Sequence, residues 1–186
     1  MKRAVVLTAY DRPDLLEETL ESLRSARGKD RWSLYISIDP SENPVIRKQV
    51  EAIASAFADL EHAAWWDSGS PMILKQYERQ GVLRHPYRVF EDLFAVGYEY
   101  VLRLEDDMLF TEDILEYHEW ASERFRGDKS VAFVESLADG AMTPESHDLA
   151  PTPDGVHVYP GFNSPLAHPV RPRGPGGARR RRAARR

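Results

Sequence analysis

The strongest constraint on the fold is a repeated alternation of apolar segments that predict strands with amphipathic segments that predict helices. Apolar runs typical of strands occupy residues 4–10, 33–39, 62–66 and 100–107. A stretch with apolar residues at helical spacing comes after each run, and these stretches begin near residues 13, 45, 85 and 111. Four strand–helix units in this order predict an α/β fold with a mostly parallel sheet flanked by helices.

Between and after these units the predicted structure is less regular. The stretch at residues 67–81 holds Gly, Ser and Pro, and we expect an irregular loop there. Thr111 is expected to be the N-cap of the fourth helix, because Glu112 and Asp113 would then fall in its first turn. Two further short strands are predicted, at residues 131–135 and 156–159.

Size and composition are those of a single domain with a substantial core. The chain has 186 residues, of which 42% are hydrophobic. No apolar run reaches about 18 residues, so no membrane span is predicted. The basic N-terminal residues precede an apolar run that is too short for a signal peptide. The lack of cysteine excludes disulfides and thiolate metal sites, and a cytoplasmic location is the default expectation.

Charge is distributed unevenly along the chain. The net charge is −5, but eight arginines lie in the last sixteen residues, and removing them leaves −13 for residues 1–170. A body this acidic repels nucleic acid. The residues from Arg171 to Arg186 are only Arg, Pro, Gly and Ala, a composition that predicts disorder.

The composition therefore divides the chain into a folded domain at residues 1–166 and a tail at residues 167–186. The tail is either a basic arm for nucleic acid or an anionic membrane, or the product of a GC-rich coding sequence read out of frame. We favour the second explanation, because out-of-frame GC-rich codons yield this composition. On that interpretation the domain is C-terminally incomplete.

Three consecutive carboxylates mark the end of the predicted strand at residues 100–107. Glu105, Asp106 and Asp107 follow its apolar run. Adjacent like charges repel one another and are rarely buried unpaired, so packing does not explain them. A hard divalent cation such as Mg²⁺ or Mn²⁺ would resolve the conflict, because it binds carboxylates together with substrate phosphates. The triplet predicts a metal–diphosphate site, with a solvated acidic turn as the alternative.

Two more polar residues are expected at the same edge of the sheet, since parallel strands share the edge where they end. Arg12 follows the first strand and could neutralise phosphate. Asp39 ends the second strand and could accept a hydrogen bond from a base imide or a ribose hydroxyl. Taken singly, Arg12 could instead pair with Asp11 or Asp14, and Asp39 could simply start a turn. Their convergence with the acids predicts a nucleotide-diphosphate site.

Motifs of several other nucleotide-binding proteins are missing. The sequence has no Gly-x-Gly-x-x-Gly after the first strand and no Gly-x-x-x-x-Gly-Lys, which counts against a dinucleotide dehydrogenase and a P-loop ATPase. A sugar-phosphate nucleotidylyltransferase would need a Gly-rich basic loop where this chain has Asp11-Arg12-Pro13.

With these features in order, the chain resembles the GT-A glycosyltransferases, most closely the inverting N-acetylglucosaminyltransferase I type of animal N-glycan synthesis. Its acidic triplet stands where that family has an Asp-x-Asp-like motif. The matching segments lie between residues 4 and 165, at 5–12, 36–39, 84–88, 104–109, 113–117 and 159–162. The resemblance implies a Rossmann-like sheet, a UDP-sugar donor, a glycan or other hydroxyl acceptor, and bound Mn²⁺ (or Mg²⁺).

The resemblance also implies a role for each acid of the triplet. Asp107 would be the direct ligand of the metal, while Glu105 and Asp106 would contact the donor sugar and the ribose. A divalent cation held by Asp107 would stabilise the departing diphosphate of a UDP-sugar electrostatically.

By the same resemblance, Arg12, Asp39 and His85 would line the nucleotide pocket, the last two beside uracil. Without the resemblance, a histidine at a helix start before Pro86 is usually structural, so the family match alone supports this role. His118, on the predicted fourth helix, is expected to be a helix-face histidine rather than a ligand.

An inverting transferase also needs a carboxylate base that deprotonates the acceptor hydroxyl. In the resembling family this base lies in an acidic, Trp-containing segment beyond the region matched by Phe162. The arginine-rich tail stands in that place, and the remaining acids nearby (Asp139, Asp148 and Asp154) are in predicted loops. The catalytic residue is therefore unknown, and the resemblance extends to donor binding but not to turnover by this chain.

The sequence thus predicts metal-dependent transfer of a sugar from a UDP-sugar to an unknown acceptor. The alternative is a non-catalytic acidic α/β domain whose basic arm binds nucleic acid. That alternative predicts salt-sensitive DNA binding that disappears when residues 167–186 are deleted.

Overall fold

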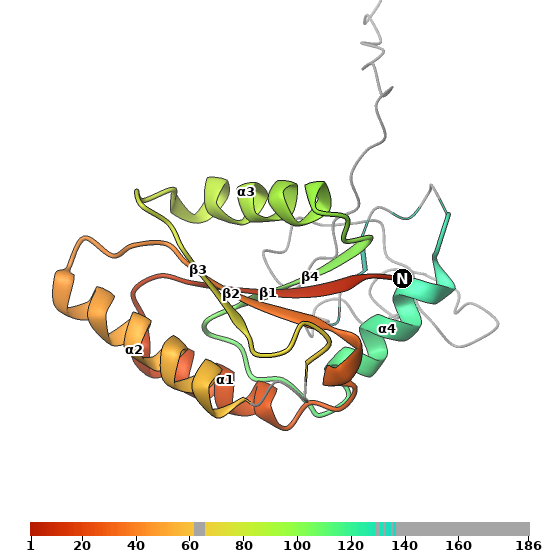
Figure 1. Ribbon diagram of the computed structural model, residues 1–186, viewed down its shortest axis with the longest axis horizontal. Coiled ribbons are helices and arrows are strands. Elements are labelled where there is room, and N and C mark those ends of the chain that lie inside the picture. Colours follow the sequence, from red (N-terminus) through yellow and green to blue (C-terminus); the bar gives the residue numbers. More distant parts are fainter. Residues whose placement is uncertain (62–65, 129–130, 132, 135, 137–186) are drawn as a thin grey trace, which may run out of the picture.

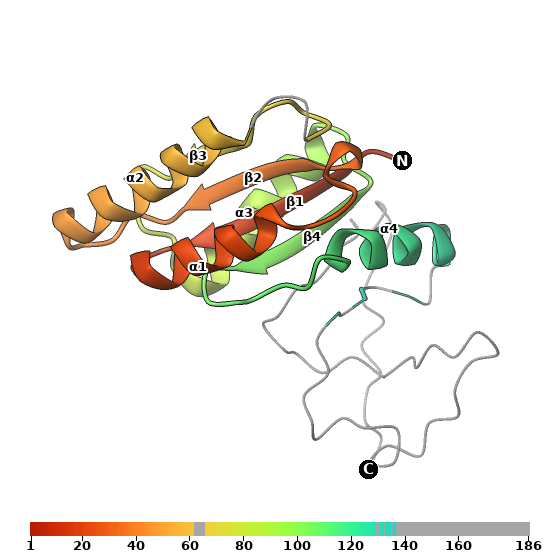
Figure 2. The same ribbon diagram turned by 90° about the horizontal axis from the view of Figure 1, so that it is seen from below.

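The described part of the chain forms one parallel sheet flanked by helices. This computed structural model describes residues 1–61, 66–128, 131, 133–134 and 136. Within them lie the strands Arg3–Ala9 (β1), Ser33–Ile38 (β2), Met72–Lys75 (β3) and Tyr100–Glu105 (β4). The strand order is β3-β2-β1-β4, and every neighbouring pair is parallel. The strands therefore end at one edge, the carboxyl edge (Figure 2).

Helices cover both faces of this sheet. Their bounds are Pro13–Arg24 (α1), Pro44–Leu60 (α2), Gly81–Ala95 (α3) and Ile114–Arg124 (α4), with a short 3-10 helix, η1, at Lys29–Arg31. α1 and α2 lie on one face and α3 lies on the other (Figure 1). α4 lies beside the opposite end of β4, where the hydroxyl of Tyr100 and Nδ1 of His118 are 3.0 Å apart. The predicted α/β class with a mostly parallel sheet is confirmed.

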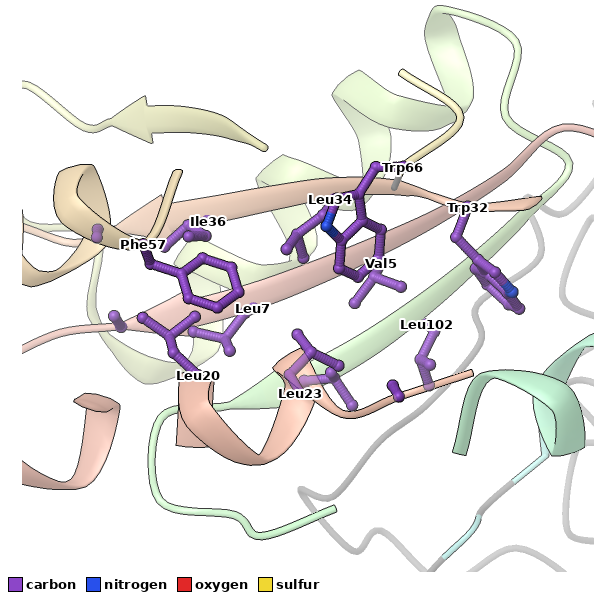
Figure 3. Packing of buried hydrophobic residues seen from close by; sticks show 14 of the residues in the cluster. Val5, Leu7, Leu20, Leu23, Trp32, Leu34, Ile36, Phe57, Trp66 and Leu102 are labelled. Carbon is purple, nitrogen blue, oxygen red and sulfur yellow. The ribbon is translucent and has the colours of Figure 1, made fainter. Parts of the chain in front are cut away.

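The larger apolar core fills the space between the sheet and the pair α1 and α2. All seven residues of β1 are buried, as expected for a central parallel strand. Each fully buried Leu, Ile or Phe stabilises the fold by roughly 1.5–3 kcal/mol. Figure 3 shows the side chains that meet there from the sheet and the two helices, among them Val5, Leu7, Leu20, Leu23, Leu34, Ile36, Phe57 and Leu102.

The face beneath α3 changes character along the strands. Near the start of the strands it is apolar, and Ala4, Val6 and Val101 pack against Val89 and Leu93 of α3. Toward the carboxyl edge the three other strands present polar residues on the same face, namely Thr8, Ser37, Arg103 and Glu105, while β3 presents Leu74. This face is therefore closed by apolar packing at one end and by polar contacts at the other.

Two boundaries near α3 differ from those predicted. Among the described residues the third strand is β3, which lies inside the stretch predicted to be irregular. Of the predicted strand 62–66 only Trp66 is described, in a bend, and residues 62–65 lie outside the described residues. β3 has four residues at the edge of the sheet, and the surrounding Gly, Ser and Pro obscured it. α3 begins at Gly81 rather than at His85, so Pro86 lies inside the helix.

The predicted N-cap of the fourth helix is wrong. Asp113 occupies the N-cap position and α4 begins at Ile114. The hydroxyl of Thr111 instead donates to the Asp113 carboxylate at 2.6 Å, and the Thr111 carbonyl accepts from the backbone N–H of Ile114. The hydroxyl of Thr111 is thus used in a local contact with Asp113 and does not cap the helix.

Several predictions fall on the C-terminal part of the chain. The described residues of the predicted strand 131–135 are Val131, Phe133 and Val134, and none of them belongs to a strand. The predicted strand at 156–159, the boundary at residue 166, the tail at 167–186, and the acids Asp139, Asp148 and Asp154 lie outside the described residues. Across the described ranges, no helix is long and apolar enough to cross a membrane.

His118 is part of the core, as the helix-face prediction implied. Its side chain is fully buried, and burial lowers its pKa to about 3, so the folded chain holds it neutral. The unfolded chain protonates histidine below a pKa of about 6.5 and so binds the proton first as the pH falls. The stabilisation that comes from neutral His118 is therefore fully present above pH 6.5, and it is lost as the pH falls from about 6.5 to 3.

Denaturant titrations between pH 7 and pH 5 test this behaviour. We expect the free energy of unfolding to fall below pH 6.5 with a slope approaching about 1.4 kcal/mol per pH unit from this residue. The His118→Phe variant should lose most of that slope. An unchanged slope in the variant would show that His118 titrates normally in the folded chain.

Candidate functional site

The carboxyl edge brings together two of the chain segments picked out by the sequence. Glu105 is the last residue of β4, and Asp106 and Asp107 form the turn after it. The side chain of Asp106 is 3% exposed. Its Oδ2 accepts from the backbone N–H of Tyr10 at 3.0 Å, so the end of β4 is fastened to the segment that follows β1.

Arg12 links the two aspartates. Its guanidinium donates to Oδ1 of Asp106 and to Oδ2 of Asp107, each at 2.5 Å. Arg12 is the N-cap residue of α1 and Pro13 is the first helical residue, which is the position expected for this proline. Its pairing with Asp11 or Asp14, the simple alternative, is not the arrangement found.

The third acid is held separately. Glu105 pairs with Arg103, its neighbour two residues earlier on the same face of β4. Burial raises the pKa of Glu105 and that of Asp106, although Arg103 and Arg12, respectively, oppose the shift. Three carboxylates and two guanidinium groups leave this cluster with one net negative charge.

Asp107 is the acid most open to a ligand. Its side chain is 33% exposed, against 16% for Glu105 and 3% for Asp106. Both oxygens of Asp106 already accept hydrogen bonds from the chain. An incoming cation could therefore reach Asp107 most easily.

Asp39 reaches the same edge from β2 but is engaged in structure. Its side chain is buried, and its two oxygens accept from the backbone N–H groups of Gln80 and Gly81, each at 2.7 Å. These N–H groups start α3, whose own N-cap residue Gln80 supplies no side-chain cap. Asp39 thus caps α3 from another element and neutralises the positive end of its dipole.

His85 lies beneath the edge rather than on its surface. It is buried on the face of α3 that packs on the sheet, with Nε2 2.7 Å from the hydroxyl of Ser37 on β2. Burial lowers its pKa, and the charge of Arg103 adds to this effect while Asp39 opposes it. His85 thus joins α3 to β2 at Ser37, two residues before Asp39, and supports the edge from below.

Sequence reasoning missed Arg79. The guanidinium of Arg79 lies 5.0 Å from the centre of the Tyr10 ring and pairs with Glu42 at 2.7 Å. Arg79 falls in the stretch predicted to be irregular, where no periodic signal marked it. If β3 had been predicted, the position of Arg79 shortly after that strand would have placed it at the carboxyl edge.

The carboxylates at the carboxyl edge suit a hard divalent cation whose other ligands come from phosphate and water. Across the described ranges, no group of three or more His, Cys, Asp or Glu side chains could hold a metal by itself. Mg²⁺ and similar ions commonly bind through one or two carboxylates, with phosphates and water completing the shell. Asp107, beside an arginine and at the end of a parallel strand, fits that mode.

Comparison with known proteins identifies the fold. No protein-family model matches the sequence, and no curated protein matches it. Among solved structures, the mannosyltransferase PcManGT from Pyrobaculum calidifontis, in complex with GDP-Man and Mn²⁺, is 16% identical, with a TM-score of 0.54 over 74% of this chain and 36% of that one. S. aureus TarS 1-349 in complex with UDP-GlcNAc is 18% identical, with a TM-score of 0.50 over 67% and 32%.

A third structure has a different activity. A cytidylyltransferase from Leptospira borgpetersenii serovar Hardjo-bovis is 13% identical, with a TM-score of 0.52 over 92% of this chain and 60% of that one. Identities this low establish a shared fold and no more. The Rossmann-like fold of GT-A-type transferases, expected from the sequence, is confirmed, and the chain spans less than two thirds of the length of each of these proteins.

The structural role of Asp39 can be tested with a neighbouring acid as control. We expect Asp39→Ala to lower the free energy of unfolding by about 2 kcal/mol, because two partly buried N–H groups lose a charged acceptor. Glu42→Ala, which removes an exposed acid at the same edge, should cost about 0.5 kcal/mol or less. Equal losses in urea denaturation would contradict the capping role.

Proposed function

We propose that the chain is the donor-binding part of a metal-dependent glycosyltransferase that takes a UDP-sugar. The observation that supports this most strongly is that the partly exposed carboxylate of Asp107 lies beside Arg12 at the carboxyl edge of a GT-A-type sheet. Ligands of open α/β sheets bind beyond the carboxyl ends of the strands. A carboxylate and a guanidinium at that place suit a cation and a diphosphate, respectively.

Each residue of the site has a distinct role in this proposal. Asp107 holds Mn²⁺ (or Mg²⁺), which, when bound, would offset the negative charge that develops on the departing diphosphate. Arg12 binds phosphate oxygens through its planar guanidinium. Glu105 and Asp106 face the donor sugar and the ribose, and Asp106 also keeps the edge in shape through the Tyr10 amide.

The uracil side of the pocket is assigned to Asp39 and His85. Both side chains are buried, and through their contacts they hold the start of α3 and the end of β2 in place beside the base. A carboxylate that already accepts two backbone N–H groups can accept another hydrogen bond, because it offers about four acceptor sites. The imide N–H of uracil is a donor of the required kind.

We further propose the inverting N-acetylglucosaminyltransferase I type that the sequence resembles. UDP-GlcNAc in TarS and GDP-Man with Mn²⁺ in the mannosyltransferase are compatible with a sugar nucleotide and a divalent cation in this fold. The acceptor, a glycan or another hydroxyl compound, and the base that activates it are not assigned to described residues.

Nucleotidyl transfer is the second candidate, because the cytidylyltransferase is similar over 92% of this chain. The segment after β1 argues against it. Asp11, Arg12 and Pro13 lead directly into α1, whereas a loop that wraps a triphosphate would need glycines at that place. A nucleotidyltransferase should prefer CTP or UTP with Mg²⁺ over UDP or a UDP-sugar with Mn²⁺.

Titration calorimetry with UDP tests the first proposal. We expect binding in the presence of Mn²⁺ that weakens at least tenfold when the ion is removed, and an equal loss in Asp107→Asn with Mn²⁺ present. The control is Asp30→Asn, which removes an exposed acid next to Arg31 in η1, away from the carboxyl edge, and should bind as the unmodified chain does. Metal-independent binding, or preference for CTP, would overturn the proposal.

A further inference from the structure

Arg12 lies between the carboxylates of Asp106 and Asp107 and offsets their charge. Its two donor nitrogens lie 2.5 Å from oxygens of Asp106 and Asp107, and one of these oxygens belongs to the proposed metal ligand. The two aspartates are adjacent in sequence, so they would repel each other without this guanidinium. The unliganded edge therefore contains its own counter-ion.

The two halves of this contact differ in how firmly they are held. Asp106 is 3% exposed and also bound by the Tyr10 amide, so it stays where it is. Asp107 is 33% exposed, and the Arg12 side chain is 44% exposed. Ion pairs between partly exposed groups are weak, so the contact between Arg12 and Asp107 can open at little cost while that with Asp106 persists.

We propose that Arg12 is an internal competitor for the metal, and that a diphosphate admits the divalent cation by drawing Arg12 away from Asp107. This inference rests on the proposed function and adds to it the order in which the site fills. Phosphate and Asp107 compete for one guanidinium. Phosphate binding therefore frees the carboxylate that the cation needs, and the two ligands favour each other's binding through the chain.

The local charge is consistent with this coupling. With Arg12 and Arg103 in place the cluster has one net negative charge, a weak attraction for a divalent ion alone. Once Arg12 turns from Asp107 to phosphate, the Asp107 carboxylate is free to bind a cation, while Asp106 keeps its contacts with the Tyr10 amide and Arg12. The cation then meets one carboxylate and a diphosphate, a combination that Mg²⁺-like ions accept.

The experiment measures the affinity of the chain for Mn²⁺ alone, by titration calorimetry without nucleotide. Arg12→Gln removes the competitor, and we expect it to bind Mn²⁺ about tenfold more tightly than the unmodified chain. Arg12→Lys keeps one positive charge but cannot bridge two carboxylates, so its affinity should lie between the two. The double variant with Asp107→Asn should lose the gain.

Arg27 provides a matched control. It bridges Glu112 and Glu116 at 3.1 and 2.9 Å, as Arg12 bridges the two aspartates, but it joins the segment after α1 to the start of α4. Arg27→Gln exposes a pair of acids and removes one positive charge in the same way. It should leave the affinity for Mn²⁺ unchanged, which separates a specific site from a general effect of charge.

The outcomes distinguish this inference from the proposed function. If UDP binds with Mn²⁺ and Asp107→Asn abolishes this, but Arg12→Gln binds Mn²⁺ alone no more tightly, the competition is refuted and the donor site stands. If UDP binding requires no metal and is lost in Arg12→Gln, Arg12 serves the phosphate directly and both ideas fail. An equal gain in Arg27→Gln would likewise refute the competition.

Discussion

The structure depends on one buried carboxylate, that of Asp106, which fastens the end of β4 to the segment after β1. Its two oxygens bind the Tyr10 amide and Arg12, so the turn that carries Asp107 cannot shift independently of the loop that leads into α1. The parallel pairing of β1 with β4 sets this register, because it brings the ends of both strands to one edge. The acids therefore serve the fold as well as the proposed site.

A similar double use applies across the edge, where Asp39 caps α3. The start of α3 depends on a carboxylate from β2, and the polar patch beneath it contains His85 and Ser37. The opposite face of the sheet stays apolar to the strand ends, with Ala9 and Ile38 buried. Polar groups thus gather on the α3 side of the carboxyl edge, where a nucleotide would find hydrogen-bond partners.

The sequence predicted the parallel sheet and the position of the acids at the end of β4, because those features are local. Apolar runs identify β1, β2 and β4, and the helix-length spacing between them predicts that they are parallel, although not their order in the sheet. The start of α3 was not predictable in this way, since its cap comes from Asp39, 41 residues before Gln80. The four-residue edge strand β3 is too short to give a clear alternation of apolar residues, and Arg79, which follows it, was therefore overlooked. The bridging geometry of Arg12 could not be read from spacing, because Asp11 and Asp14 are far nearer to Arg12 in sequence than Asp106 and Asp107 are.

A crystal structure of the chain with UDP and Mn²⁺ would test the central claim most directly. Anomalous scattering from manganese should place the ion on the Asp107 carboxylate at the carboxyl edge, with the diphosphate beside it and Arg12 turned from Asp107 to a phosphate oxygen. Manganese bound elsewhere, or Arg12 still bridging both aspartates with the nucleotide in place, would contradict it.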